Sequence, residues 1–392
     1  MKIFNHSKAL EDLPQQFFAK LVKDVSKVTT EGHDVINLAQ GNPDQPTPEH
    51  IVRSAQAAVA NPLFHKYSPF RGYPFFKEAA AEFYKREYDV DIDPETEVAV
   101  LFGGKAGLIE VSQCLLDEED IALVPDPGYP DYWSGVSLAR AEMVPMPLLE
   151  ENQYLPDYSK IDETVLKAAK LMFLNYPNNP TGAIATPEFF EETVRVANEN
   201  DICIVHDLAY GAIGFDEEKP LSYLQTEGAK DVGIEIYTLS KTYNMAGWRV
   251  GFAVGNRSVI AALNLLQDHL HVSLFGGVQE AAATALTASQ ECVKELVSLY
   301  ESRRNFLMDR LKEIGWDVEP PKGSFFAWLP VPEGFTSQSF FQKLLQEAHV
   351  AVAPGIGFGA YGEGYVRVGL LREEEELAEA VRRIGKLGLF KK

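Results

Sequence analysis

The sequence is poor in cysteine, with only Cys114, Cys203 and Cys292 among 392 residues. The three lie far apart, so they lack the close spacing that is typical of metal ligands. Cys114 and Cys203 fall within apolar runs, which favours packing as their role. Few, scattered thiols are typical of a reducing compartment, and because the metal-ligand spacing is missing we expect no bound metal.

Basic residues and long apolar runs are also scarce. The 36 Lys and Arg residues stand against 57 Asp and Glu, and the resulting net charge of −21 argues against nucleic acid or anionic lipid as a partner. No run approaches the ~20 apolar residues that a membrane span needs, and the first six residues lack the apolar core of a signal peptide. We therefore expect a soluble, cytoplasmic protein without a nucleic-acid or membrane partner.

The remaining composition is that of a globular protein. Hydrophobic residues make up 46% and charged residues 24% of the chain, as is ordinary for soluble domains. The length allows two domains with sizeable cores, and no repeat, linker or low-complexity segment interrupts it. Helical periodicity or composition predicts helices within residues 1–36 and over residues 48–60, 257–272, 277–314 and 373–388.

The most informative stretch begins with the apolar run 234–239, which reads as a buried strand. Lys241 follows at its tip. On its own a lysine is most often a solvated loop residue, but a lysine amine can also form a Schiff base with an aldehyde cofactor. The hydroxyls of Thr238 and Ser240, with Arg249 eight residues after the lysine, can hold a phosphate. These neighbours favour a cofactor site.

A second phosphate-binding pattern lies at Gly103-Gly104, between a predicted strand over residues 97–102 and a predicted helix. Free amides and the helix dipole both favour an anion at such a helix start. Two glycines at a turn are common, so this pattern is a weak signal by itself. Lys105 follows the glycine pair.

Candidate site residues also follow other predicted strands. Asp207 ends the apolar run 201–207, with Tyr210 three residues later, and Asn179 lies in a turn made rigid by prolines. Tyr129 follows another short strand. Open α/β sheets bind ligands at the carboxyl ends of their strands. A carboxylate there can keep a pyridine nitrogen protonated, although a helix cap is the alternative role for Asp207.

Three further residues suit a ligand site. Gly41 lies in a turn-rich segment and allows a ligand to approach the backbone closely. Tyr67 lies in a predicted loop, where an aromatic residue more often serves packing. Arg367 alternates with valines in a predicted strand, so it lies on the face opposite to them, and a guanidinium binds a planar carboxylate through two parallel hydrogen bonds. The Gly-rich segment 354–362 before it suits a closing lid.

Together these segments resemble the class I/II aminotransferases, which are pyridoxal-phosphate (PLP) enzymes of the aspartate aminotransferase superfamily. The motifs occur in the family's order from about residue 40 to residue 370, so the resemblance covers nearly the whole chain. The most specific of them are the Asn-Pro-Thr-Gly segment that begins at Asn179 and the lysine segment around Lys241.

The resemblance implies an α/β fold of the PLP-dependent type I. A mixed, mostly parallel sheet is expected in a large PLP-binding domain at residues 41–280. A smaller α+β domain is expected at residues 281–392, joined by an N-terminal arm and further residues from 1–40. The family also implies a homodimer with shared active sites and small-molecule substrates, an amino acid and a 2-oxo acid.

The resemblance further implies a role for each matching residue, by its position in the family's motifs. The implied catalytic residues are Lys241, Asp207 and Tyr210. The implied cofactor-binding residues are Gly103, Gly104, Lys105, Tyr129, Asn179, Asp207, Tyr210, Thr238, Ser240, Lys241, Arg249 and, from the partner subunit, Tyr67. The implied substrate-binding residues are Gly41, Asn179 and Arg367. The family often has Ser or Thr where Lys105 stands, which leaves a contact between Lys105 and the phosphate open.

Several stretches, such as HKYSPFRG and LFGGKAGL, are similar to the methionine-salvage aminotransferases of bacilli. That subgroup implies transfer from glutamine to 4-methylthio-2-oxobutanoate. Aromatic, aspartate or diaminopimelate specificity are alternatives, as is a PLP-dependent C–S β-lyase, although such lyases tend to carry Leu where Trp248 stands. A non-catalytic PLP-binding regulator is a third reading, which the acidic charge disfavours.

Overall fold

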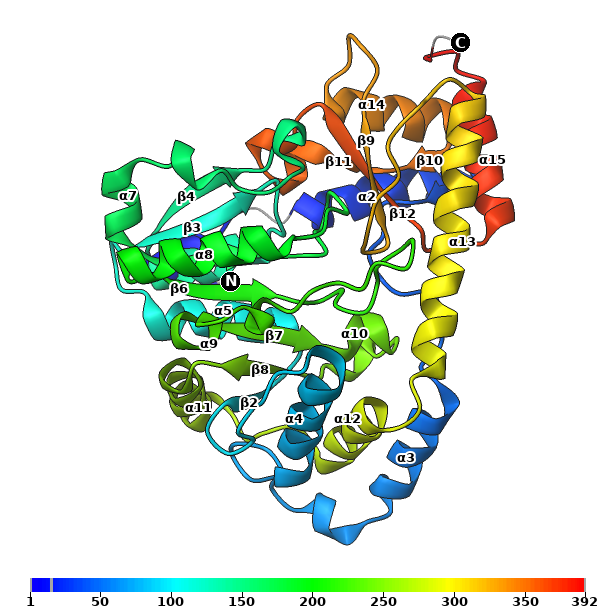
Figure 1. Ribbon diagram of the computed structural model, residues 1–392. Helices are drawn as coiled ribbons and strands as arrows, with labels where there is room; N and C mark the ends of the chain where they lie inside the picture. Colours follow the sequence, from blue (N-terminus) through cyan, green and yellow to red (C-terminus); the bar gives the residue numbers. More distant parts are fainter. Residues whose placement is uncertain (1, 15–16, 391–392) are drawn as a thin grey trace.

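The computed structural model describes residues 2–14 and 17–390. At its centre lies one seven-stranded sheet (Figure 1). In order across the sheet, the strands are β2 (Val98–Leu101), β8 (Gly251–Gly255), β7 (Gly233–Thr238), β6 (Cys203–Asp207), β5 (Ala169–Leu174), β3 (Ile121–Asp126) and β4 (Glu142–Pro147). Only β8 runs antiparallel to its neighbours. The predicted α/β fold with a mixed, mostly parallel sheet is confirmed.

Helices cover both faces of this sheet (Figure 1). One face carries α4 (Pro74–Tyr88), α8 (Pro187–Asn200) and α12 (Gly276–Thr287), and the other carries α5 (Gly104–Leu115), α6 (Asp131–Ala139) and α11 (Arg257–Leu270). Successive strand residues alternate between the two cores, as Val98 and Ala99 do. Because both faces are buried, the inner strands such as β5 are almost continuous apolar runs, whereas the edge strand β4 is largely exposed.

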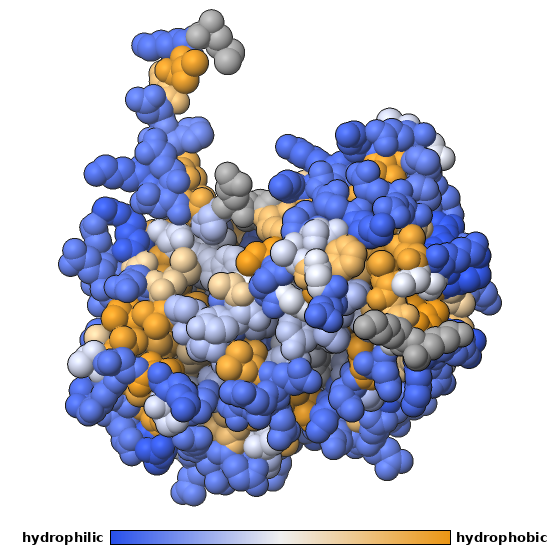
Figure 2. Space-filling model, turned by 90° about the horizontal axis from the view of Figure 1, so that it is seen from above, coloured by the Kyte–Doolittle hydropathy of each residue, from blue (hydrophilic) through white to orange (hydrophobic). Residues whose placement is uncertain are grey.

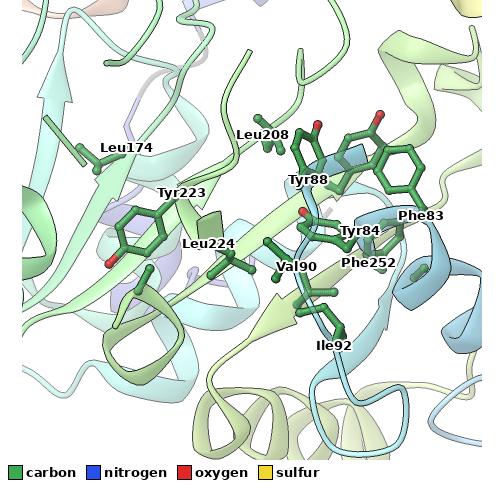
Figure 3. Close-up of a cluster of buried hydrophobic side chains, with 14 of the residues drawn as sticks. Phe83, Tyr84, Tyr88, Val90, Ile92, Leu174, Leu208, Tyr223, Leu224 and Phe252 are labelled. Atoms are coloured by element: carbon green, nitrogen blue, oxygen red, sulfur yellow. The ribbon is translucent and has the colours of Figure 1, made fainter. Parts of the chain in front are cut away.

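Aromatic side chains fill the core on the α4 face, as Figure 3 shows. Tyr84 of α4 meets Phe252 of β8 edge to face, with ring centroids 6.0 Å apart. The Tyr84 hydroxyl donates to Oε1 of the buried Glu235 at 2.7 Å, which anchors α4 to β7. Such packing gives the strand ends a rigid base.

A second core is built from the C-terminal part of the chain. An antiparallel sheet of β11 (Ala353–Pro354), β12 (Tyr365–Gly369) and β9 (Phe326–Pro330) packs with α13 (Glu291–Glu313), α14 (Ser337–Lys343) and α15 (Glu374–Gly385). The N-terminal helix α2 (Phe17–Thr30) buries Leu21 and Val28 in this core. Next along the chain, β1 (Ile36–Asn37) pairs in parallel with β10 (Val350–Ala351). Domain boundaries at residues 40 and 280 stay a prediction.

The remaining helices are α1 (Lys8–Glu11), α3 (Glu49–Val59), α7 (Glu163–Ala168), α9 (Ala229–Val232) and α10 (Leu239–Thr242). Within residues 2–14 and 17–390, no helix has the length and apolar character needed to cross a lipid bilayer.

The prediction of one helix over residues 277–314 is wrong, because two separate helices, α12 and α13, occupy this segment and residues 288–290 between them are not helical. Neither Gly nor Pro marks this break. Instead, the side-chain nitrogen Nε2 of Gln290 donates to the backbone carbonyls of Ala285 and Ala288. Its amide oxygen accepts the hydroxyl of Tyr243 at 2.7 Å. A side chain thus satisfies the carbonyls that the helix end leaves free.

Candidate active site

A cavity of about 410 Å³ lies at the carboxyl ends of the parallel strands, between the central sheet, α2 and β12. The structure brings together there every predicted site residue except Gly103 and Tyr67. These residues are Gly41, Gly104, Lys105, Tyr129, Asn179, Asp207, Tyr210, Thr238, Ser240, Lys241, Arg249 and Arg367. Residues as far apart in the sequence as Gly41 and Arg367 therefore line one cavity.

Lys241 lies on α10, directly after β7. The Thr238 hydroxyl caps this short helix by accepting the Ser240 amide at 3.3 Å. The Lys241 Nζ donates to the Gly41 carbonyl at 2.9 Å. Burial lowers the pKa of Lys241 to about 8, the charge of Arg367 adds to this, and Asp207 opposes it. An amine with such a pKa is partly neutral near physiological pH, so it can act as a nucleophile or a base.

Asp207 lies at the end of β6 and is 5% exposed. Burial raises the pKa of its carboxyl to about 6, although the hydrogen bond from Tyr132 opposes this. The Tyr132 hydroxyl donates to Asp207 Oδ2 at 2.9 Å, and the Tyr132 ring stacks on Phe173 with centroids 5.0 Å apart. At neutral pH the carboxylate is ionised and held in place, as pairing with a cationic ring nitrogen requires.

Sequence reasoning missed two supporting residues, Tyr132 and Asn175. Asn175 Nδ2 donates to the Asp207 carbonyl at 2.7 Å, while its Oδ1 accepts the Asn179 amide at 2.8 Å. This side chain joins the ends of β5 and β6. Its place at the end of a predicted strand could have pointed to it, whereas nothing in the sequence marks the hydroxyl of Tyr132.

The start of α5 forms an anion cradle. Gly103 has a φ of +85°, which favours glycine, and a Cβ there would lie 2.5 Å from Arg249 Nη2, so a larger residue would displace this guanidinium. Gly103 is the residue directly before α5 and does not itself line the cavity. The Lys105 Nζ pairs with Asp131 Oδ1 at 2.8 Å. The helix amides, Arg249 and the hydroxyls of the Thr238–Ser240 turn are the groups that could hold a phosphate.

Arg367 is 4% exposed and held on two sides. Its Nη1 donates to Asn179 Oδ1 at 2.8 Å and its Nη2 to the Ala39 carbonyl at 2.9 Å. Its Nε has no hydrogen-bond partner among the described residues. Burial lowers the pKa of Arg367 to about 10, so it remains a cation at neutral pH. A desolvated guanidinium with a spare donor suits a carboxylate.

The Gly-rich segment is docked on the large sheet rather than projecting from it. Asp126 accepts the amides of Ala360 and Tyr361, both at 3.0 Å. The short helical turn before them places Phe358 against Arg367, whose guanidinium carbon is 4.7 Å from the ring centroid. Closing of this segment over a substrate stays a prediction.

Tyr67 lies outside the cavity of its own chain and is 90% exposed. Its predicted role concerns the active site of a partner subunit, and it remains a prediction.

The chain belongs to the aminotransferase class I and II family, whose model matches residues 33–384. It is 68% identical to L-glutamine--4-(methylsulfanyl)-2-oxobutanoate aminotransferase of Bacillus subtilis, covering 99% of this chain and 97% of that protein. It is 43% identical to LL-diaminopimelate aminotransferase of Halothermothrix orenii, covering 96% of each. The substrate-bound BacF structure from Bacillus subtilis superposes with a TM-score of 0.95 at 52% identity, covering 100% of this chain and 99% of that one.

Enzymes of this family depend on PLP, and the cavity offers what that group requires. It presents a buried lysine amine, a buried carboxylate and a helix start shaped as an anion cradle. The orphaned Nε of Arg367 adds a donor for a substrate carboxylate. The residues present therefore fit a PLP site.

Proposed function

We propose that this aminotransferase binds PLP at Lys241 and transfers an amino group from L-glutamine to 4-(methylsulfanyl)-2-oxobutanoate, that is, 4-methylthio-2-oxobutanoate, to yield methionine. The observation that carries the chemistry is the desolvated Lys241 amine, influenced by both Asp207 and Arg367. The substrate assignment is supported by the 68% identity to the Bacillus subtilis enzyme of that name. The free, scattered cysteines suit a cytoplasmic location.

Bound PLP would supply an aldehyde that links covalently to amines and a ring that accepts the electrons of a broken Cα–H bond. Lys241 Nζ would provide the amine that links to the cofactor and, once the substrate amine has taken its place there, would carry the proton from the substrate Cα to the cofactor. The Asp207 carboxylate would keep the ring nitrogen protonated, with Tyr132 fixing the carboxylate in place. Each of these steps uses a side chain whose protonation is set by burial.

Other residues orient the reactants. The α5 amides, Thr238, Ser240 and Arg249 would hold the phosphate. Tyr129 would stack on the ring, while Asn179 and Tyr210 would bind its phenolic oxygen. Arg367, beside the loop of Gly41, would bind the α-carboxylate that both substrates share. If the Gly-rich segment 354–362 closes over this cavity, it would exclude water from the reacting atoms.

The shared carboxylate site predicts a defect in both half-reactions. Arg367→Lys keeps the charge but loses the paired donors, so kcat/KM should fall about 10–100-fold for donor and acceptor alike. The PLP absorbance should remain. Stopped-flow measurement of each half-reaction provides the test, and a defect confined to one substrate would exclude Arg367 as the common carboxylate site.

We further propose a homodimer with shared active sites. Tyr67 and Phe70, which lie close together in one loop, are exposed at 90% and 55%. An arm of the chain projects from the body of the molecule (Figure 2), and Ile3 and Phe4, which precede α1, are exposed at 84% and 76%. Large apolar side chains exposed in this way are typical of surfaces that meet a partner.

Hybrid dimers test the shared site. In a dimer of one Tyr67→Phe and one Lys241→Ala chain, one site would carry both defects and the other neither. Mixing the two impaired variants should therefore restore part of the activity. Native mass spectrometry would verify that hybrids form. Hybrids without restored activity would contradict a contribution of Tyr67 across the interface.

A substrate screen tests the activity itself. The PLP-loaded enzyme should need both glutamine and a 2-oxo acid for turnover, and 4-(methylsulfanyl)-2-oxobutanoate should give the highest kcat/KM among acceptors. A C–S lyase would turn over with one amino acid alone, and a regulator with neither. A preference for aromatic, aspartate or diaminopimelate substrates would refute the substrate assignment while leaving the transaminase chemistry intact.

A further inference from the structure

A buried histidine and glutamate, which the chemistry above does not use, lie next to the active site in the fold. His206 of β6 directly precedes Asp207, and Glu235 is its partner in register on the neighbouring strand β7. Both side chains are wholly buried, and His206 Nδ1 lies 2.6 Å from Glu235 Oε2. Polar side chains are costly to bury unless their atoms find hydrogen-bond partners, so the remaining partners of this pair are informative.

The carboxylate of Glu235 is fixed by two segments besides its own strand. Its Oε1 accepts the hydroxyls of Tyr84 and Ser222, at 2.7 Å and 2.6 Å. Its Oε2 accepts the backbone amide of Tyr223 at 2.9 Å. The donors come from α4 and from the turn at residues 222–223, so Glu235 provides a rigid acceptor for the histidine ring.

The second ring nitrogen of His206 determines which tautomer is present. The backbone amide of Tyr176 donates to His206 Nε2 at 3.2 Å. A backbone amide can only donate, so Nε2 must present its lone pair. The ring proton therefore lies on Nδ1, where it is donated to Glu235. His206 is thus a neutral ring that is anchored on one side and holds a backbone amide on the other.

That amide belongs to the turn that carries Asn179. The turn is held at its start by His206, through the amide of Tyr176. At its other end the amide of Asn179 donates to Asn175 Oδ1 at 2.8 Å. The Asn179 side chain meets Arg367 Nη1 at 2.8 Å, so the position of this turn bears on both residues. Small displacements of positioning groups can weaken a site substantially.

We propose that His206, oriented by Glu235, is a positioning residue of the active site, which through the Tyr176 amide places Asn179 for contact with PLP. The proposal rests on the aminotransferase function above and adds a residue to the support of that site. An apolar pair of similar volume could fill the same space in the core, but it would leave the Tyr176 amide without an acceptor. This requirement explains a buried histidine at a strand end.

Two substitutions separate the two sides of the ring. His206→Asn keeps a donor near the position of Nδ1 but is too short to reach Tyr176. His206→Gln can place its side-chain oxygen near the position of Nε2, so it can still accept the Tyr176 amide while it loses the contact with Glu235. When PLP is titrated into the apoprotein, its dissociation constant should rise about tenfold in His206→Asn and stay within about threefold of wild type in His206→Gln.

Tyr84→Phe is the matched control, because it removes one donor to Glu235 and does not touch the turn. It should lower the thermal unfolding temperature of the apoprotein without changing the dissociation constant of PLP. Equal weakening of PLP binding in His206→Asn and His206→Gln, or the same weakening in Tyr84→Phe, would mean that His206 serves stability alone. Unchanged PLP binding in His206→Asn would also overturn the inference.

Nitrogen-15 NMR of the wild-type apoprotein, labelled at histidine, tests the geometry without any substitution that must fold. The His206 signals, identified by their absence from His206→Gln or His206→Asn, should show a protonated Nδ1 and an unprotonated Nε2 at neutral pH. A proton on Nε2 would exclude acceptance of the Tyr176 amide and would refute the proposal. Because neither measurement includes a substrate, a failure of the proposed substrates in the activity screen is a separate result.

Discussion

Replacing Lys241 with alanine should abolish nearly all amino-group transfer. The other amine among the described residues that line the cavity is that of Lys105, which is paired with Asp131. The variant loses both the covalent link to PLP and the base for the Cα proton, so two functions are lost together. Lys241→Arg keeps a cation of similar length and should be equally inactive, because a guanidinium neither links to the aldehyde nor titrates near neutral pH.

Two measurements check this expectation. The visible absorbance of lysine-bound PLP should be missing from both variants, and turnover should be near background. In the wild-type apoprotein, the rate of PLP capture should rise through pH about 8, where burial places the pKa of Lys241, rather than near 10.5. Substantial activity in Lys241→Ala would refute the assignment.

Replacing Asp207 with asparagine should slow Cα-proton transfer by about 10²–10³-fold while PLP still binds, as is typical for the loss of an electrostatic stabiliser. The same change should make the apoprotein more stable at neutral pH. Burial raises the folded-state pKa of Asp207 from 3.8 to about 6. Between these values the folded protein holds a proton that the unfolded chain releases, so the stability contribution of this group falls as pH rises through that window.

The stability gain is bounded by that shift, at about 3 kcal/mol above pH 6. Thermal unfolding of wild type and Asp207→Asn at pH 8 and below pH 4 measures it, and the gain should vanish at the lower pH. Tyr132→Phe serves as a control, because it removes the hydrogen bond that favours the ionised carboxylate. It should raise the pKa of Asp207 further. An unchanged single-turnover rate in Asp207→Asn would contradict its role.

The sequence predicted the positions of the cavity residues well for a physical reason. Asn179, Asp207 and Lys241 each lie at or shortly after the end of an apolar run typical of a buried strand, and parallel strands bring their carboxyl ends to one edge. Each of these short segments therefore contains both the functional side chain and the strand end that positions it. The α/β class followed from the family resemblance that these segments carry.

What the sequence did not reveal depends on contacts between distant segments. The partner of Tyr132 is a carboxylate 75 residues away, and the pairing of Lys105 with Asp131 changes how that lysine can be interpreted. The break before α13 arises from the side chain of Gln290 rather than from Gly or Pro. The docking of the Gly-rich segment required the carboxylate of Asp126. None of these pairings has a local signature.

The pairing of β1 with β10 constrains how the chain can be made. Ile36 needs Val350 as its neighbour, and α2 needs the C-terminal core to cover Leu21 and Val28. During synthesis at ~5–20 residues per second, this apolar N-terminal segment waits on the order of 15–60 s for its partners. The central sheet can form in the meantime, but the N-terminal helix stays exposed on the ribosome. Because its partners are among the last residues to be made, the N-terminal segment can dock only when synthesis is nearly complete.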